Sequence, residues 1–293
     1  MSRRGWLLFS AMSVIWGIPY LLIKIAVAEL TPATLVLARV GVAALVLLPI
    51  TVRRRELVPV LRRWRPLIAY TAVELCVPWY FLAFAEQTLS SSLTGLLLAM
   101  VPLVSAILVL ITGHERLGAR RVFGLILGFA GVAALVGLDL HGSLVAVGAV
   151  AVVAVCYAVG PFILARYLSD SPDLGVVAAS LLVSAVVYLP FGVAQAPNTM
   201  PGASVVIAVV TLGVVCTALA FVLFFRLIAE VGPARATVIT YVNPAVALVL
   251  GVVVLNESFT VVTAIGFALI LVGSVLGTGR DRRPAETPVC AEP

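Results

Sequence analysis

Charged side chains are scarce in this sequence: Asp, Glu, Lys and Arg make up 11% of its 293 residues. Ordinary globular chains carry about 25% charged residues, so a soluble fold of this length would lack the charge to cover its surface. Histidine is almost missing, with only His114 and His141, and both lie in polar segments between apolar runs. We therefore do not expect a membrane-embedded enzyme, whose site would need clustered His, Asp or Cys.

Recognisable cofactor and metal motifs are also missing. No G-x-x-x-x-G-K-[ST] segment occurs, so an ATP-driven pump would need a separate subunit. Cysteines 76, 156 and 216 lie in apolar runs and Cys290 lies near the end of the chain, without metal-ligand spacing. The net charge of +6 does not indicate a nucleic-acid partner, because the basic residues form short clusters between apolar runs. We predict no cofactor, no metal and no catalytic residue.

Hydrophobic residues, by contrast, make up 62% of the chain, and its mean hydropathy is +1.20. The apolar runs reach the roughly 20 residues that a helix needs to cross about 30 Å of hydrocarbon. The first run begins like a signal peptide, but it is too long for one and Pro19 and Lys24 interrupt it. We predict an all-α integral membrane protein in the lipid bilayer, with ten transmembrane helices. They lie near residues 6–28, 32–52, 66–86, 92–112, 120–138, 143–165, 174–194, 203–225, 233–255 and 260–278.

The basic residues predict the orientation of these helices. With the N-terminus in the cytoplasm, 17 of the 19 Lys and Arg residues fall on cytoplasmic segments, and Lys24 and Arg39 lie within predicted helices. This distribution follows the positive-inside rule. We predict a multi-pass protein of the cell (cytoplasmic) membrane with both termini cytoplasmic. Residues 279–293 are polar and contain proline, which predicts a disordered cytoplasmic tail.

The two halves of the sequence share features at an offset of 142 residues. The matched pairs are Pro102 and Pro244, Glu115 and Glu257, Gly124 and Gly266, and Gly131 and Gly273. The offset corresponds to five predicted helices, and because five is odd the halves must cross the membrane in opposite senses. We predict two inverted five-helix repeats, residues 1–139 and 140–278. Such repeats are typical of secondary transporters, although a duplication without a mechanical role stays open.

These residues carry a resemblance to a known family. The chain resembles the EamA-type transporters of the drug/metabolite transporter (DMT) superfamily over nearly its whole length. The motifs are Trp16-Gly17, Arg39, a Pro-containing fourth helix ending in Glu115-Arg116-Leu117, the series Gly124, Gly128 and Gly131, and Pro244, Glu257, Gly266 and Gly273. The second repeat departs at Asn256-Glu257-Ser258 and lacks a Trp-Gly pair near Tyr157. The resemblance implies ten helices and transport of small metabolites, amino acids or drugs, often outward.

Ionisable residues within predicted helices are functional candidates because they are costly in lipid. Glu74 lies roughly 12 Å from the cytoplasmic boundary, counted at 1.5 Å per residue, and suits a proton-coupling group or an anchor for an amine. A purely structural pairing with a neighbouring helix is equally open. Arg39 either receives a substrate carboxylate or pairs with Glu86 or Glu74 to fix helix packing. Lys24 lies near a helix end, where we expect its ammonium to snorkel to the interface.

Aromatic residues and prolines near mid-depth complete the predicted site. A proline frees a backbone carbonyl, which lipid tolerates only beside protein or a water-filled cavity. Aromatic walls with a few polar groups are typical of ligand pockets, although Tyr and Trp also anchor helices at the interface. The candidates for the substrate pathway are Trp16, Arg39, Glu74, Trp79, Tyr80, Pro102, Tyr157, Tyr241, Asn243 and Pro244. Glu115 and Glu257 lie at loop ends, where we expect capping or loop pairing.

Together these features predict a secondary transporter that works by alternating access on a small-molecule substrate. We expect an exporter with Glu74 as the coupling group, and leave a homo-oligomer open. The main alternative is a lipid flippase or scramblase, which differs in substrate more than in mechanism. A channel is a weaker alternative, since it would need rings of like residues from symmetric subunits.

Overall fold

The computed structural model of the chain describes residues 1–111, 118–138, 144–236 and 238–278, and the regular secondary structure in these ranges is all helical. Nine helical segments are long and apolar enough to cross a membrane within this described part, and Ile239–Leu255 is a shorter apolar helix at the position of the ninth predicted span. The fold prediction is therefore confirmed. The predicted tail, the boundary at residue 139, His114, His141 and Glu115 lie outside the described residues.

We number the ten segments as crossings 1 to 10. Crossings 1 to 5 are α1 (Arg3–Ile15) with α2 (Pro19–Ala26); α3 (Pro32–Arg53); α5 (Trp64–Thr71), η1 (Ala72–Cys76) and α6 (Val77–Glu86); α7 (Ser91–Leu98) with α8 (Val101–Ile111); and α9 (Ala119–Leu138). Crossings 6 to 10 are α10 (Leu144–Tyr167); α11 (Asp173–Ala194); α12 (Ala203–Gly213), η2 (Val214–Leu219) and α13 (Ala220–Val231); α15 (Ile239–Leu255); and α16 (Val261–Thr278). Two short helices, α4 (Leu57–Arg62) and α14 (Pro233–Ala236), join crossings 2 to 3 and 8 to 9.

Local sequence explains where several crossings begin and where two of them break. Thr31 and Ser90 are N-caps whose side chains accept from the N–H groups of Thr34 and Leu93, at 3.3 and 3.1 Å. Crossing 1 breaks just before Pro19, and crossing 4 breaks just before Pro102. Proline cannot donate to the preceding turn, so each break leaves backbone carbonyls that neighbouring groups must satisfy.

The 142-residue repeat recurs as a matched irregularity in the third crossing of each half. Crossing 3 contains the π-helical turn η1 and crossing 8 contains η2, and their first residues, Ala72 and Val214, differ by 142 positions. A π-turn widens the helix locally and leaves a carbonyl without its usual partner. In crossing 3, the Tyr188 hydroxyl donates to the Cys76 carbonyl oxygen at 2.9 Å. In crossing 8, the Thr217 hydroxyl donates to the Leu212 carbonyl oxygen at 2.8 Å.

Crossings 5 and 10 pack along their glycines. A Cβ on Gly273 would lie 2.6 Å from the Gly124 carbonyl oxygen, and one on Gly131 would lie 2.6 Å from the Gly266 carbonyl oxygen. The second contact is the first one shifted by 142 residues with the helices exchanged, as an in-plane pseudo-two-fold requires. Small residues at such a crossing let two backbones approach in lipid. The close-packing role expected for these glycines is thus seen directly.

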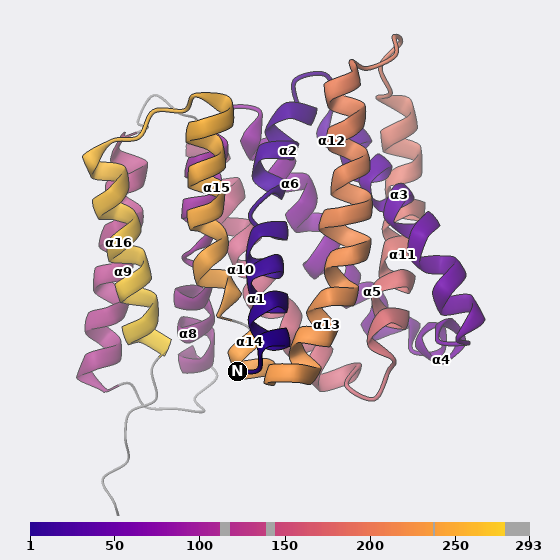
Figure 1. Cartoon of the computed structure of the whole chain (residues 1–293), viewed down its shortest axis with the longest axis horizontal. Helices are drawn as coiled ribbons and strands as arrows, with labels where there is room; N and C mark the ends of the chain where they lie inside the picture. The colour runs from indigo at the N-terminus through magenta and orange to yellow at the C-terminus, as the bar shows by residue number, and fades with distance from the viewer. Residues whose placement is uncertain (112–117, 139–143, 237, 279–293) are drawn as a thin grey trace, which may run out of the picture.

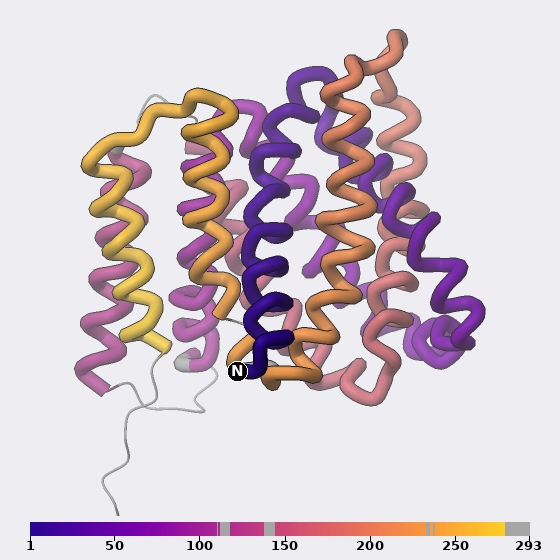
Figure 2. Tube along the Cα trace, in the orientation of Figure 1, coloured from indigo at the N-terminus to yellow at the C-terminus, as the bar shows by residue number. Residues whose placement is uncertain are grey.

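Helix packing elsewhere is also paired between the repeats. Crossing 2 packs against crossing 7 (α3 with α11), and crossing 3 packs against crossing 6 (α6 with α10), whose image is crossing 8 against crossing 1 (α12 with α2, α13 with α1). Figures 1 and 2 show crossings 5 and 10 at one edge of the molecule, and crossings 2 and 7 toward the other. The most extensive helix contacts therefore join the two repeats, and the core lies between them.

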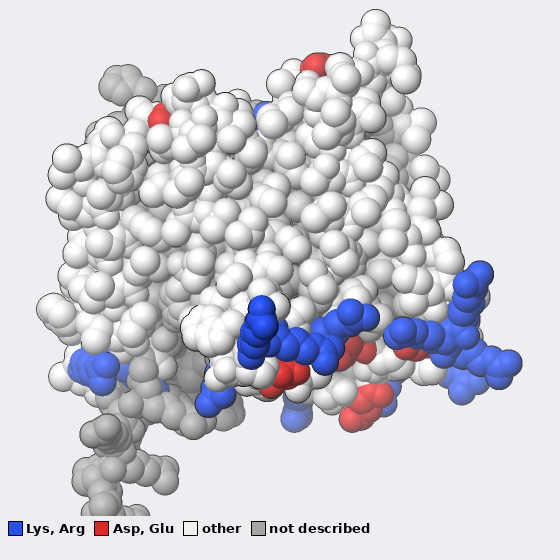
Figure 3. All heavy atoms as spheres, viewed as in Figure 1, with Lys and Arg blue, Asp and Glu red and all other residues white. Residues whose placement is uncertain are grey.

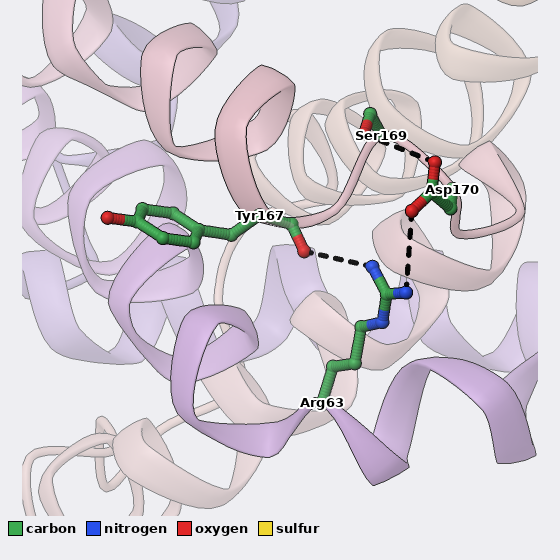
Figure 4. Close-up of polar contacts among 4 residues, drawn as sticks. All are labelled: Arg63, Tyr167, Ser169 and Asp170. Atoms are coloured by element: carbon green, nitrogen blue, oxygen red, sulfur yellow. Dashed lines mark hydrogen bonds and ion pairs between the residues drawn. The ribbon is translucent and has the colours of Figure 1, made fainter.

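Basic residues gather at one end, which we call the basic end. Figure 3 shows Lys and Arg along the lower end, where the N-terminus lies in Figure 1, below a face that is almost free of charge. Here the Arg63 guanidinium, before crossing 3, donates to the Tyr167 carbonyl oxygen at 3.1 Å and pairs with Asp170 at 3.5 Å (Figure 4). At the opposite end, Glu29 accepts from the Gly202 N–H at 2.7 Å. Each contact joins the loop after a repeat's first crossing to the start of the other repeat's third.

Candidate functional site

Glu74 lies in the π-turn of crossing 3 and faces crossing 6. A Cβ added to Gly160 on α10 would overlap the Glu74 carboxylate, so only glycine at that position lets the carboxyl reach the helix backbone. Among the described residues, Glu74 Oε2 is buried and has no hydrogen-bond partner. Buried polar groups are nearly always bonded. An unpartnered carboxyl oxygen in the middle of a membrane crossing is therefore available to a proton or a ligand.

Arg39 lies on crossing 2 at the interface with crossings 3 and 8, and 7% of its surface is exposed. Its Nε donates to Thr217 Oγ1 at 3.1 Å, and its guanidinium lies 3.7 Å from the centre of the Trp79 ring. The interpretation that Arg39 pairs with Glu86 or Glu74 is wrong, because no such ion pair is present among the described residues. The Arg39 guanidinium instead makes a cation–π contact with Trp79 and a hydrogen bond to the Thr217 hydroxyl.

Tyr157 lies near both of these groups. It projects from α10, is partly buried against both large core clusters, and interacts electrostatically with Glu74 and with Arg39. Tyr80, on the neighbouring helix α6, stacks on Tyr188 of crossing 7 with ring centres 6.3 Å apart. The fold thus brings five of the predicted site residues into one neighbourhood, which we call the central cluster: Arg39, Glu74, Trp79, Tyr80 and Tyr157.

Trp16 lies apart from the central cluster, at the break in crossing 1. Its ring is 6.0 Å from the Phe221 ring and 4.7 Å from the Phe224 ring of crossing 8. The adjacent Gly17 is needed for packing, since a Cβ there would lie 2.5 Å from the Val246 side chain and 3.0 Å from the Asn243 carbonyl oxygen. The Trp-Gly pair therefore fills an aromatic junction and brings crossing 1 against crossing 9.

The predicted prolines lie beside side chains that donate to backbone carbonyls. The Ser274 hydroxyl of crossing 10 donates to the Ala99 carbonyl oxygen, just before Pro102, at 3.2 Å. Asn243 precedes the buried Pro244; with its amide nitrogen facing the carbonyls, it donates to the Ser13 and Ile239 oxygens at 3.1 and 2.9 Å. These contacts tie helix breaks to neighbouring crossings.

Tyr241 lies at the end of crossing 10 rather than with the central cluster. Its hydroxyl is 3.2 Å from the Thr278 hydroxyl, and this contact is exposed. Tyr241 is two residues from the start of α15, and Thr278 is the last residue of α16. This position is near the basic end.

Lys24 does not snorkel to the interface as expected. Its ammonium donates to the backbone carbonyl oxygens of Glu86 and Leu89, both at 2.7 Å. The last carbonyls of a helix lack intrahelical partners, and a cation there also suits the helix dipole, so Lys24 caps the end of crossing 3. The Glu86 carboxyl is fully buried, and among the described residues neither of its oxygens has a hydrogen-bond partner.

Sequence reasoning missed several members of this region. Thr217 is the group that holds Arg39, Gly160 makes room for Glu74, and Tyr188 bonds the π-turn of crossing 3. One signal was in the sequence: Cys216, beside Thr217, stands 142 residues after Glu74. The 142-residue offset could therefore have indicated that the segment around Cys216 is the structural counterpart of the segment around Glu74. The roles of Gly160 and Tyr188 depend on which helices meet.

A cavity of about 390 Å³ lies elsewhere, near the basic end. Its lining comes from crossings 2, 7 and 8 and includes none of the predicted site residues. The lining residues are Ile50, Arg54, Leu174, Val222, Phe225, Arg226 and Ala229. It lacks the buried, unpartnered polar atom that marks the central cluster, so we place the candidate site at the central cluster.

Comparisons with known proteins agree with this architecture. The model of the EamA-like transporter family matches residues 3–137 and again residues 144–278. A protein of Archaeoglobus fulgidus described as an uncharacterized transporter is 22% identical over 273 residues, covering 92% of this chain and 97% of that protein. A crystal structure with 23% sequence identity superposes with a TM-score of 0.67, covering 95% of this chain and 97% of the other. At this identity the solved structure supports the fold alone.

Proposed function

Because the chain belongs to the EamA-like transporter family, we propose that it exports small metabolites, amino acids or drugs by proton-coupled alternating access. The family makes it a multi-pass membrane transporter of a small-molecule substrate, and not an enzyme. Substrate, direction and coupling belong to the proposal. The cytoplasmic membrane, with both termini inside, is likewise proposed, on the distribution of basic residues.

The observation that carries the proposal is the state of Glu74. Its carboxyl lies in a helix irregularity at the interface of the two repeats, and one of its oxygens is buried without a hydrogen-bond partner among the described residues. A group that binds a proton or an amine on one side and releases it on the other needs this lack of a permanent partner. Glu74 also lies where crossing 3 of one repeat meets crossing 6 of the other, so a movement between the repeats changes its surroundings.

We propose that the rest of the central cluster recognises the substrate. Trp79 and Tyr80 supply aromatic surface, and Tyr157 lies near both the acidic Glu74 and the basic Arg39. Arg39 uses its Nε for Thr217, and its other N–H groups suit a carboxylate. The proposal assigns Trp16, Pro102, Asn243, Pro244 and Tyr241 to the walls and helix breaks of the same pathway.

Transport by purified protein in liposomes tests this function directly. The screen first measures thermal stabilisation by a metabolite library, and the stabilising compounds are then assayed for counterflow, with and without a pH gradient. We expect a pH gradient to drive accumulation and a protonophore to abolish it. If the internal concentration of the compound never exceeds the external concentration, the result would favour a channel. Scrambling of a labelled phospholipid without counterflow of any solute would favour the flippase alternative.

The orientation has its own test. In a variant with the four native cysteines replaced by alanine, we expect Thr88→Cys and Asn198→Cys to react with an impermeant maleimide on intact cells. Both positions are exposed, and they follow crossings 3 and 7, whose other ends begin beside Arg63 and Asp170 at the basic end. Ser169→Cys, exposed beside Asp170 at the basic end, should react only after permeabilisation. The reverse pattern would invert the proposed topology.

A further inference from the structure

Crossings 4 and 9 pack against each other more closely at one end than at the other. Crossings 4 and 9 are equivalent by the repeat, so a symmetric arrangement would join them alike at both ends. At the end opposite the basic residues, α7 packs closely against α15, and a Cβ on Gly95 would lie 2.6 Å from the Ala247 Cβ. In the described part of crossing 4 nearer the basic end, α8 packs instead against α10 and α16, with at most marginal contact with α15.

A single carboxylate caps the packed end. Glu257, just beyond crossing 9, accepts from the backbone N–H groups of Ser91 and Ser92 at 2.7 and 2.9 Å. These are the first two residues of α7, so a negative charge there satisfies two orphan donors and suits the helix dipole. The capping role expected for Glu257 is thus present, and it links the two repeats. Its counterpart by the offset, Glu115, lies outside the described residues.

The local backbone is shaped for this contact. Asn256 adopts the left-handed conformation, with φ of 55°, at the end of α15, and the Glu257 N–H then donates to the Gly251 carbonyl oxygen at 3.1 Å. A Cβ on Gly251 would overlap the Ser92 hydroxyl and the Glu257 carboxylate. Partial burial favours the protonated carboxyl, but the hydrogen bonds from Ser92 and Ser91 outweigh it and hold the pKa of Glu257 below its usual value. The cap is therefore anionic at neutral pH.

We infer that the Glu257 cap on crossing 4 is a latch that holds the transporter closed at the end opposite the basic residues. This inference rests on the proposed alternating access. Opening at that end must separate α7 from α15, and the two N–H groups then lose their carboxylate. The contact of Glu29 with Gly202 at the same end has a counterpart at the basic end, Arg63 with Asp170, so we expect it to stay in place.

Distances between spin labels test the latch in lipid nanodiscs. One pair, Thr88→Cys with Phe259→Cys, spans the latch; the other, Ala28→Cys with Met200→Cys, flanks the Glu29 contact, and all four positions are exposed. Both pairs are made in a background without native cysteines. In Glu257→Ala, we expect the ratio of the longer to the shorter Thr88–Phe259 distance to rise roughly 2- to 30-fold, the equivalent of losing an N-cap. Glu257→Gln should give a smaller rise in the same direction.

The matched control removes Glu29, a second carboxylate among the described residues that bonds a loop N–H at this end. Glu29→Ala should leave the Thr88–Phe259 distribution unchanged, and Glu257→Ala should leave the Ala28–Met200 distribution unchanged. An unaltered Thr88–Phe259 distribution in folded Glu257→Ala and Glu257→Gln would overturn the latch. So would equal broadening of both pairs. Counterflow measured with the same wild-type protein separates the two ideas, because active transport without a Glu257 effect removes the latch and leaves the function standing.

Discussion

Glu74→Gln is expected to abolish the response of transport to a pH gradient. Glutamine keeps the size of the side chain and the space beside Gly160, but it cannot exchange a proton. If the carboxylate instead anchors an amine substrate, the affinity of the variant for that amine should fall about 10- to 150-fold, since a hydrogen bond to a charged group contributes about 1.5–3 kcal/mol. Counterflow at fixed pH, compared with pH-driven accumulation in the same liposomes, distinguishes the two roles.

The neighbouring glycine supplies a sharper version of this experiment. Gly160→Ala should impair transport in the wild-type background, because its Cβ overlaps the Glu74 carboxylate. In a Glu74→Ala background the same change should have little further effect on thermal stability, since the shortened side chain leaves room for the methyl group. Gly148→Ala on the same helix, where an added Cβ meets nothing within 4 Å, is the matched control. Unchanged proton coupling in folded Glu74→Gln would remove Glu74 from the proposed mechanism.

Gly273→Val is expected to produce the largest loss of stability among these variants. A Cβ at this position would lie 2.6 Å from the Gly124 carbonyl oxygen and still closer to the backbone of Gly128. Backbone atoms cannot turn aside as a flexible side chain can, so crossings 5 and 10 must move apart. Overpacking typically costs about 1–3 kcal/mol, and occasionally more. We expect a lower thermal aggregation temperature, or no monodisperse protein, by fluorescence-detected size-exclusion chromatography.

Gly137→Val, on α9 itself, controls for the effect of valine in a helix. An added Cβ at Gly137 meets nothing within 4 Å, so this variant should behave almost as the wild type. Gly131→Val should resemble Gly273→Val, because the two glycines are equivalent by the repeat and both face backbone atoms across the helix pair. Equal stability of Gly273→Val and Gly137→Val would mean that close backbone packing does not hold crossings 5 and 10 together.

The 142-residue offset relates the two halves in more than the number of helices, but it does not predict every local feature. The offset of 142 that pairs Gly124 with Gly266 also pairs the two π-turns, although no π-turn was predicted. It did not anticipate where the halves differ. Crossing 1 breaks before Pro19, whereas α10 continues past Pro161, the equivalent residue. The offset identifies equivalent positions in the two halves. It does not predict the local packing around each position, which differs between the halves.

Sequence alone determined the solvent, the ten crossings, the inverted repeat and the family resemblance. Hydrophobicity and charge are read residue by residue, and lipid tolerates few other arrangements of such a chain. It also singled out Glu74 and Arg39, because charge at membrane depth is conspicuous in any sequence. Their partners were not predictable in this way.

Only the tertiary structure decided what those charges meet. Arg39 lies against Thr217 and Trp79 rather than a carboxylate, Glu74 rests on Gly160, and Lys24 caps a helix. Each of these contacts joins residues on different crossings, so it depends on how helices pack and on where a helix is irregular. The same holds for the Glu257 cap, which exists because α7 of crossing 4 packs against α15 of crossing 9.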